Sequence, residues 1–334
     1  MWLPDHTLRH LGRVATWPEF TGDRYTVVRE LGRGGMGTVY LAHDKVLLRD
    51  VALKVSNAAS DDPSLEARMQ TEAHVLARLE HPGIVPIHDV GTLADGRLYY
   101  VMKLVRGRTL EGYLSDRLDL PERLRVFERV CEPVAFAHAH GVVHRDLKPG
   151  NVMVGSFGEV LVMDWGVAKV LQEGQASPPA TPSPAAPHGS TDPGTVLGTR
   201  GFMSPEQARG RVDLTDQRSD VYALGAMLFW LLTGEEPLDA TEAAEPLGGD
   251  RLGQVPRRLR AICLTAAATD AADRYPGVAE LVADVARFRA GQSVTAYHET
   301  VLDRGVRLLG TYRVPVLLVL AYLVMRVLVA WWAG

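Results

Sequence analysis

Three groups of residues along this 334-residue chain have the types and spacing needed to bind a phosphate group and act on it. The first is the segment Leu31 to Tyr40, LGRGGMGTVY, in which glycines recur in the pattern G-x-G-x-x-G-x-V. Because glycine has no side chain, the backbone amides of such a segment can approach phosphate oxygens closely. A dinucleotide-binding turn would need a helix to begin at the third glycine, whereas Thr38 to Leu41 read as a strand. The pattern therefore favours a glycine-rich hairpin.

A lysine and a glutamate form the second group. Lys54 ends the strand-like run VALK at 51–54, and by itself it could be a solvated edge lysine. Glu72 lies on the apolar stripe of a predicted helix, three residues after Met69 and four before Leu76. A carboxylate on an inward face needs a cationic partner. We therefore predict that Glu72 holds Lys54, with the lysine directed at phosphates.

The third group is the run His144 to Asn151, HRDLKPGN, which matches H-R-D-L-x-x-x-N at every position. Thirteen residues after Asn151 comes Asp164-Trp165-Gly166, similar to D-F-G with tryptophan replacing phenylalanine. An unrelated polar turn is disfavoured because eight consecutive positions fit. With the glycine segment and Lys54, these motifs resemble the bacterial eukaryotic-like (Hanks-type) serine/threonine protein kinase family over about residues 25–289, most of the chain.

The resemblance implies binding of ATP with Mg²⁺ or Mn²⁺, and transfer of the γ-phosphoryl group to Ser or Thr hydroxyls of protein substrates, including the chain itself. Asp146 would accept or orient the proton of the hydroxyl, and Lys148 would reach the γ-phosphate beside it. Asn151 and Asp164 would hold the metal ion, since hard dications prefer oxygen ligands. Trp165 keeps a large apolar group at its position, so we expect activity to be retained, while the change from phenylalanine would alter the balance between active and inactive packing.

The nucleotide site is assigned by the same resemblance. The glycine segment contributes Leu31, Gly32, Arg33, Gly34, Gly35, Met36 and Gly37, and the rest of the site is Val39, Ala52, Lys54, Met102, Lys103, Val105 and Met153. Met102 would be the gatekeeper, and the backbone of Lys103 and Val105 would contact the adenine edge. Three apolar residues, Val39, Ala52 and Met153, would sandwich the ring, although such residues are more often plain core.

Ser204-Pro205-Glu206 resembles the A-P-E motif at the end of the activation segment, with Ser204 replacing the usual alanine. The resemblance places Thr199 beside the catalytic residues. It also implies a buried ion pair between Glu206 and Arg274, the alternative being two exposed charges. Asp220 resembles the aspartate that receives backbone amides of the catalytic loop. A helix N-cap is the other role considered for it, and the two roles are compatible.

Regulation by phosphorylation is a further hypothesis. In the family, an arginine before the catalytic aspartate, here Arg145, pairs with a phosphorylated residue of the activation segment. The candidate residues are Ser190, Thr191 and Thr195. Residues 174–194 are rich in Pro, Ala, Ser and Gly and cannot bury enough apolar surface to order themselves, so we predict a disordered insert there.

The strands and helices predicted around these groups indicate an α+β, two-lobed fold. Strands are expected over Tyr25 to Leu31, Val39 to Ala42, Val51 to Val55 and Leu98 to Val101, and helices over Leu124 to His140 and Val221 to Leu232. We divide the chain into an extension (1–24), a kinase domain (25–290), a juxtamembrane segment (291–313) and a C-terminal hydrophobic helix (314–332). Within the kinase domain, a β-rich lobe (25–102) with one helix precedes a helical lobe (106–290).

The C-terminal segment 314–332 is apolar over about 19 residues, interrupted only by Arg326. Three arginines precede it and no positive charge follows it, so the positive-inside rule predicts a single-pass membrane anchor with a cytoplasmic kinase domain. An amphipathic or buried helix is the alternative, because an arginine within a span is costly.

Composition narrows the classes of partner. A formal charge of −4 argues against a chain that coats nucleic acid, and two cysteines cannot build a disulfide framework, which suits a reducing compartment.

The alternatives to an active enzyme are a pseudokinase scaffold, a small-molecule phosphotransferase and a membrane receptor. The intact catalytic residues disfavour the pseudokinase, and the Glu206 and Arg274 pair disfavours the small-molecule enzyme. The receptor is disfavoured because almost nothing follows the predicted anchor 314–332 to act as a sensor. Pairing with a second copy through the small lobe stays open.

Overall fold

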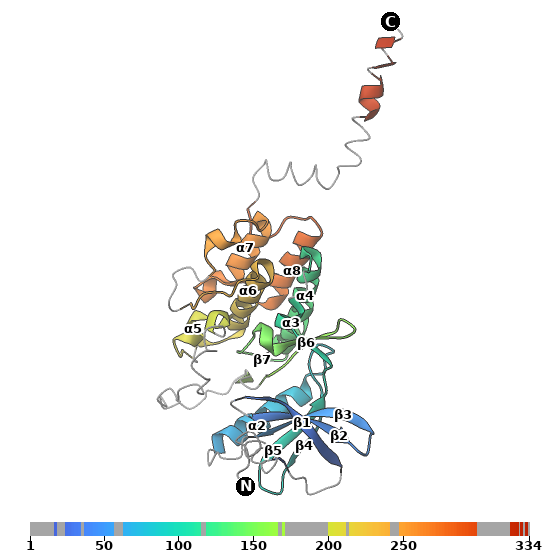
Figure 1. Cartoon of the computed structure of the whole chain (residues 1–334). Coiled ribbons are helices and arrows are strands. Elements are labelled where there is room, and N and C mark those ends of the chain that lie inside the picture. Colours follow the sequence, from blue (N-terminus) through green and yellow to red (C-terminus); the bar gives the residue numbers. More distant parts are fainter. Residues whose placement is uncertain are drawn as a thin grey trace, which may run out of the picture.

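A five-stranded antiparallel sheet and one helix make up the first lobe of the computed structural model (Figure 1). The strands are β1 (Tyr25–Arg33), β2 (Gly37–Asp44), β3 (Arg49–Ser56), β4 (Ile87–Thr92) and β5 (Leu98–Lys103), in the spatial order β1-β2-β3-β5-β4. Helix α2 (Pro63–Arg78) packs beside this sheet. The structure describes residues 17–18, 24–34, 37–56, 63–114, 118–165, 169–170, 200–211, 214–240, 247–298, 321–326, 328–329 and 331–332.

The two faces of β3 are both buried, and this decides where Lys54 points. Val51, Leu53 and Val55 join an apolar cluster on the outer face of the sheet, against which Trp17 also packs. Since successive side chains of a strand alternate between faces, Ala52 and Lys54 lie on the other face, toward α2. The predicted alternative of a solvated edge lysine is therefore wrong.

The second lobe is mainly helical, and with the first it confirms the predicted two-lobed fold (Figure 1). Its helices are α3 (Leu110–Leu114), α4 (Leu120–Ala139), α5 (Pro205–Ala208), α6 (Gln217–Thr233), α7 (Arg257–Ala266) and α8 (Val278–Arg289). Short strands, absent from the sequence-based prediction, are β6 (Gly107–Thr109), β7 (Val142–Val143), β8 (Val152–Gly155), β9 (Val160–Val162) and β10 (Lys169–Val170). Single 3₁₀ turns occur at Pro149–Asn151, Arg200–Phe202, Gly249–Leu252 and Ala271–Asp273.

Helix α6 is the core of the second lobe, as its continuous apolar run predicted. Every residue from Ser219 to Leu231 is buried, so the helix is packed on all sides. Gly225 allows its closest approach to α7, because a Cβ atom there would lie 2.7 Å from Cβ of Ala266. This rigid centre supports the loops that carry the predicted catalytic residues.

The packed body continues past α8. The buried carboxylate of Asp284 accepts hydrogen bonds from the hydroxyl of Tyr275, from both the amide and the hydroxyl of Thr295, and from the amide of Ala296. These bonds hold the backbone that follows α8 against the lobe, and Val294 lies in the main core cluster. The residues of this turn therefore belong to the folded second lobe.

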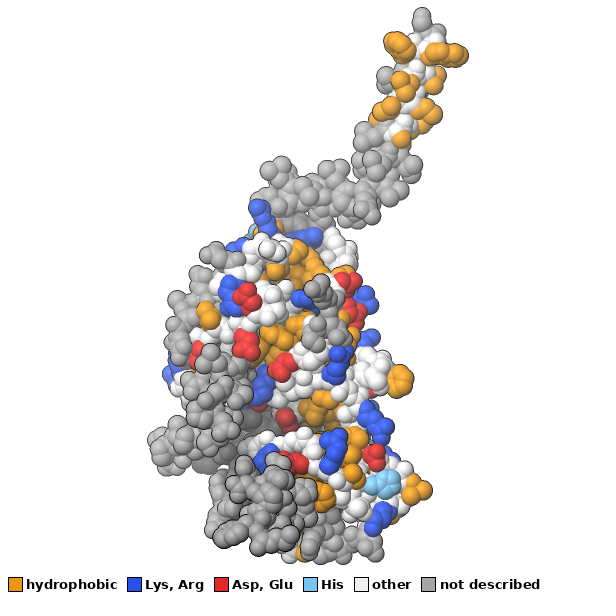
Figure 2. Space-filling view, in the orientation of Figure 1, with side chains coloured by type: hydrophobic (Ala, Val, Ile, Leu, Met, Phe, Trp, Pro, Cys, Tyr) orange, Lys and Arg blue, Asp and Glu red, His pale blue; other side chains and the backbone are white. Residues whose placement is uncertain are grey.

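Near the C-terminus, residues 321–326, 328–329 and 331–332 are helical, and the hydrophobic ones are exposed (Figure 2). The rest of the predicted hydrophobic helix 314–332 lies outside the described residues, as do the insert 174–194 and most of the extension 1–24. In the part of the chain that is described, no helix is both long enough and apolar enough to cross a bilayer.

Candidate active site

The predicted ion pair between Lys54 and Glu72 is present and buried. The ammonium of Lys54 lies 2.9 Å from Oε1 and 3.1 Å from Oε2 of Glu72, and both side chains are almost fully excluded from solvent. Glu72 also accepts a hydrogen bond of 2.9 Å from the hydroxyl of Tyr100, a residue that the sequence analysis did not single out. Lys54 further lies 3.6 Å from a carboxylate oxygen of Asp164, so the pair links the first lobe to the second.

Asp146 lies in the loop between β7 and the turn Pro149–Asn151, with its carboxylate one-third exposed. The ammonium of Lys148 lies 3.0 Å from its Oδ2 atom, and the side-chain amide of Asn151 donates to the same oxygen at 3.0 Å. The Asn151 amide also donates to the backbone carbonyl of Asp146 at 2.8 Å. The carboxylate is therefore held in one orientation while part of it faces solvent.

The backbone of this loop is held by the side chain of Asp220 on α6. Its carboxylate accepts the amides of His144 and Arg145 at 2.8 Å each, and His138 lies 2.7 Å from it. Burial alone would raise the pKa of Asp220. The hydrogen bond from His138, the charges of His138 and His144 and the Arg145 amide outweigh burial and lower the pKa. The predicted role for Asp220 as receiver of loop amides is confirmed. The alternative role as N-cap is wrong, because Asp216 caps α6 by accepting the amide of Arg218.

The segment that carries Asp164 is tied to the same loop. The amide of Met163 donates to the carbonyl of Asn151 at 2.8 Å, and Nε2 of His144 lies 2.9 Å from the carbonyl of Met163. Trp165 is fully buried with its ring 4.6 Å from that of His144, so it fills the position of the usual phenylalanine. Asp164 adopts a left-handed backbone, with φ of 54°, and its side chain is half exposed. These bonds bring Asp164 to the same region as Asn151.

The oxygen donors of Asn151 and Asp164 fit a hard divalent cation. Because the amide nitrogen of Asn151 donates to Asp146, its Oδ1 atom is the one left to coordinate. The carboxylate of Asp164 is a preferred magnesium ligand. Within the described ranges no group of three or more His, Cys, Asp or Glu side chains could hold a metal alone.

The glycine segment forms the β1–β2 hairpin, as predicted. The amide of Gly34 donates to the carbonyl of Gly37 at 2.9 Å. A Cβ atom at Gly37 would lie 2.4 Å from the carbonyl oxygen of Val55, so only glycine allows β2 to lie this close to β3. Leu31, Gly32 and Arg33 form the end of β1, and Gly35 and Met36 lie outside the described residues.

Four of the predicted adenine residues, Val39, Ala52, Met102 and Val105, belong to or pack against one apolar cluster. Ala52, Met102 and Leu161 are buried in one cluster. Val39 and Val105 pack against this cluster, and Leu161 is a member that the sequence analysis missed. Lys103 is exposed, which suits a residue predicted to contact the base through its backbone. Met153 lies on β8, directly opposite Leu161 on β9, and is partly buried.

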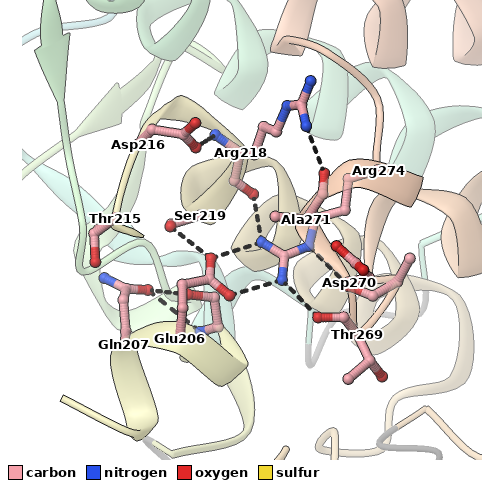
Figure 3. Close-up of polar contacts among 12 residues, drawn as sticks. Glu206, Gln207, Thr215, Asp216, Arg218, Ser219, Thr269, Asp270, Ala271 and Arg274 are labelled. Atoms are coloured by element: carbon pink, nitrogen blue, oxygen red, sulfur yellow. Dashed lines mark hydrogen bonds and ion pairs between the residues drawn. The ribbon is translucent and has the colours of Figure 1, made fainter. Parts of the chain in front are cut away.

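Glu206 and Arg274 form the predicted buried ion pair, with two contacts of 2.7 and 2.8 Å (Figure 3). Glu206 also accepts the hydroxyl of Ser219, and Arg274 donates to the carbonyls of Arg218, Ala268 and Thr269. All five guanidinium donors are thus satisfied without exposure. The pair joins α5, which follows the predicted activation segment, to α6 and the turn before α8.

Arg145 is the one predicted regulatory residue that the structure describes; Ser190, Thr191, Thr195 and the catalytic candidate Thr199 lie outside the described residues. Its backbone is left-handed, with φ of 71°, and its carbonyl accepts the side-chain amide of Gln207. The buried Nε and Nη2 atoms of Arg145 have no hydrogen-bond partner among the described residues. Burial lowers the pKa of this guanidinium, and the Asp220 carboxylate opposes that effect.

Comparison with known proteins agrees with this geometry. Residues 25–264 match the protein kinase domain. The chain is 39% identical over 279 residues to a probable serine/threonine-protein kinase PknB of Lactococcus lactis, covering 79% of this chain and 42% of that protein. It is 38% identical over 297 residues to the serine/threonine-protein kinase PknB of Mycolicibacterium smegmatis, covering 84% of this chain and 45% of that protein. The chain thus spans less than half the length of these relatives.

The fold is also similar to that of a solved bacterial kinase domain. The crystal structure of the PknI kinase domain of Mycobacterium tuberculosis aligns with a TM-score of 0.59 at 30% identity, covering 80% of this chain and 96% of that one. The family match at residues 25–264 spans both lobes and includes the loops that hold Asp146 and Asp164. The chain therefore belongs to the protein kinase family, among the bacterial serine/threonine kinases of the Hanks type.

Proposed function

We propose that this chain transfers the γ-phosphoryl group of ATP to serine or threonine hydroxyls of proteins, including its own. The observation that carries the proposal is the Asp146 carboxylate, which is partly exposed yet oriented by both Lys148 and Asn151. The Asp164 carboxylate lies 3.6 Å from the ammonium of Lys54, which is itself paired with the buried Glu72. The lysine therefore lies next to a predicted metal ligand. The serine/threonine kinases named above support the choice of acceptor.

The residues act mainly by position and charge. Asp146 accepts the proton of the acceptor hydroxyl while the hydroxyl oxygen bonds to the γ-phosphorus and the bond to ADP breaks. The ammonium of Lys148, 3.0 Å from Asp146, is placed to offset negative charge on the transferring group. Lys54, held by Glu72, orients the remaining phosphates. Asn151 and Asp164 would hold Mg²⁺ or Mn²⁺, which when bound neutralises phosphate charge.

The direct test is to incubate the purified chain with γ-labelled ATP, Mg²⁺ and a generic basic protein, followed by phosphoamino acid analysis. We expect phosphoserine or phosphothreonine on the substrate and on the chain. ATP binding without any transfer would contradict this proposal and support a pseudokinase. Label appearing only on a small-molecule acceptor would favour a metabolic phosphotransferase instead.

We also propose that phosphorylation of the activation segment controls this activity through Arg145. Buried guanidinium nitrogens without hydrogen-bond partners, such as Nε and Nη2 of Arg145, are costly, and a phosphate would supply charge-assisted hydrogen bonds to them. Phosphatase treatment should lower activity about tenfold, because one hydrogen bond to a charged group contributes about 1.5 kcal/mol. An Arg145→Met variant should start at the lower rate and be unaffected by phosphatase.

The matched control for this prediction is Arg129→Met, which removes an exposed arginine that donates only to the carbonyl of Gly158. This variant should keep both the wild-type rate and its sensitivity to phosphatase. Alanine at Ser190, Thr191 and Thr195, one at a time, identifies the phosphorylated residue. Activity that is unchanged both by phosphatase and by all three alanine substitutions would refute control through this segment.

We propose, finally, that the C-terminal segment anchors the chain in a membrane as a single span, with the kinase domain in the cytoplasm. Eight of its large hydrophobic side chains are at least half exposed, from Leu323 at 52% to Trp332 at 87%, which is costly in water. The full-length chain should sediment with membranes and resist extraction by salt. The double substitution Leu323→Asp and Val324→Asp should release it, because each aspartate opposes insertion by about 3 kcal/mol.

The control for anchoring is Phe157→Asp, which places the same charge on a hydrophobic residue that is 95% exposed at the β8–β9 turn of the second lobe. That variant should stay with membranes. Wild-type protein recovered in the soluble fraction would contradict the anchor.

A further inference from the structure

Tyr100 contacts both members of the buried ion pair. Its hydroxyl donates to Oε1 of Glu72 at 2.9 Å, and the ammonium of Lys54 lies 5.5 Å from the centre of its ring. The second distance is within the range of a cation–π interaction. Tyr100 is 2% exposed, so both contacts are made in the absence of bulk water.

Strand register accounts for this placement. Tyr100 on β5 pairs directly with Lys54 on β3, and directly opposed residues of antiparallel strands have side chains on the same face with Cβ atoms about 5 Å apart. That face is covered by α2, which carries Glu72 and packs through Met69 and Ala73. The tyrosine ring therefore spans from the sheet to the helix beside the lysine.

The hydrogen bond has a fixed direction. A carboxylate can only accept, so the Tyr100 hydroxyl must be the donor. Burial, followed by the nearby Glu72 charge, raises the pKa of Tyr100 well above its usual value, and the hydroxyl stays protonated at physiological pH. Oε1 of Glu72 consequently receives two donors, one from β3 and one from β5.

We infer that Tyr100 is a positioning residue that holds Glu72, and with it α2, in place while Lys54 engages the phosphates of the nucleotide. The inference rests on the proposed function. A buried carboxylate left without a partner is strongly unfavourable. When the Lys54 ammonium shifts part of its bonding to a phosphate, the Tyr100 hydroxyl keeps Glu72 satisfied, and the helix does not need to move.

The test replaces the hydroxyl alone. Tyr100→Phe keeps the ring over Lys54 and removes the bond to Glu72, and kcat/KM for ATP should fall about tenfold, as for loss of one hydrogen bond to a charged group. The matched control is Tyr99→Phe, the same change on the neighbouring residue, which packs on the outer face of the sheet. Its kcat/KM should stay within about twofold of wild type.

Two further measurements separate positioning from general stability. In a Glu72→Gln background, Tyr100→Phe should lower kcat/KM by less than about twofold, because the charged acceptor is gone. Hydrogen exchange of peptides covering α2 should be faster in Tyr100→Phe than in wild type or Tyr99→Phe. In Lys54→Met, exchange of α2 should rise only partly, and adding Tyr100→Phe should raise it further.

Equal losses of activity in the wild-type and Glu72→Gln backgrounds would overturn the inference, since the tyrosine would then act only on stability. Unchanged exchange of α2 in Tyr100→Phe and in the Lys54→Met double variant would overturn it as well. If the wild-type chain transfers no phosphate, the proposed function fails, yet the exchange measurements still decide whether Tyr100 holds Glu72.

Discussion

Asp146→Asn should lower phosphoryl transfer by about three orders of magnitude, within the range found for loss of a positioned general base. The amide has nearly the same shape, so the fold and nucleotide binding should persist. It cannot take up the proton of the acceptor hydroxyl. Because the Lys148 ammonium donates to both oxygens of Asp146, the amide nitrogen would face that donor whichever way the amide is turned. The rate is measured with labelled ATP and a basic protein, and nucleotide binding by calorimetry.

The control for Asp146→Asn is the same change at Asp95, whose carboxylate is half exposed and pairs only with Arg97 in the β4–β5 turn. That variant should keep the wild-type rate. Mass spectrometry of the chain with and without ATP adds a second measure, because ATP-dependent phosphate should vanish in Asp146→Asn. A rate above a tenth of wild type would show that another group receives the proton.

The largest loss of stability is expected for Arg274→Met. The change leaves the Glu206 carboxylate buried and without its guanidinium, and it removes the donors of three backbone carbonyls (Figure 3). Removing one partner of a buried pair costs about 3–5 kcal/mol of unfolding free energy. Urea unfolding followed by circular dichroism measures it. The control Arg125→Met removes a half-exposed arginine paired with Glu122 and should cost less than about 1 kcal/mol.

The same pair predicts how stability depends on pH. Burial alone would raise the pKa of Glu206, but hydrogen bonds from Arg274 and Ser219 outweigh it and lower the pKa from 4.5 to about 2. A carboxylate with a depressed pKa stabilises the fold fully above its unfolded pKa, and this contribution is lost as the pH falls from 4.5 toward 2.

In Arg274→Met, the Ser219 hydroxyl still donates to Glu206, but the guanidinium no longer opposes the effect of burial, so protonation of Glu206 relieves the charge left without its cation. The difference in unfolding free energy between wild type and Arg274→Met should therefore be largest above about pH 5 and should narrow as the pH falls toward 2. A difference that does not change with pH would mean that the lost packing of the arginine, and not the charge of Glu206, sets the cost.

Residues that act as contiguous motifs were predictable, because neighbouring chemistry does not depend on how distant segments pack. The runs HRDLKPGN and DWG and the glycine hairpin needed only their own spacing. Glu72 was also predictable, since helical periodicity places it on the inward face, and a buried carboxylate requires a cation. The continuous apolar run of α6 likewise predicted a fully packed helix.

Elements that owe their existence to partners elsewhere were missed. Strands β7 and β10 have two residues each and pair with one another across a long stretch of sequence. So short a segment has no periodicity of its own, and it becomes a strand only because its partner satisfies its backbone. The N-cap of α6 was misplaced for a related reason. Asp216 and Asp220 are both good capping residues, and only the burial of Asp220 under the catalytic loop distinguishes them.

The sequence by itself determined which groups carry the chemistry, because the identity of a carboxylate, an amide or a lysine and its place in a motif are local properties. Only the tertiary structure decided which groups hold them in place. Tyr100 holds Glu72 from 28 residues away, and Asp220 holds the loop amide of His144 from 76 residues away. Such contacts depend on strand register and helix packing, which bring together side chains whose separation along the chain carries no signal.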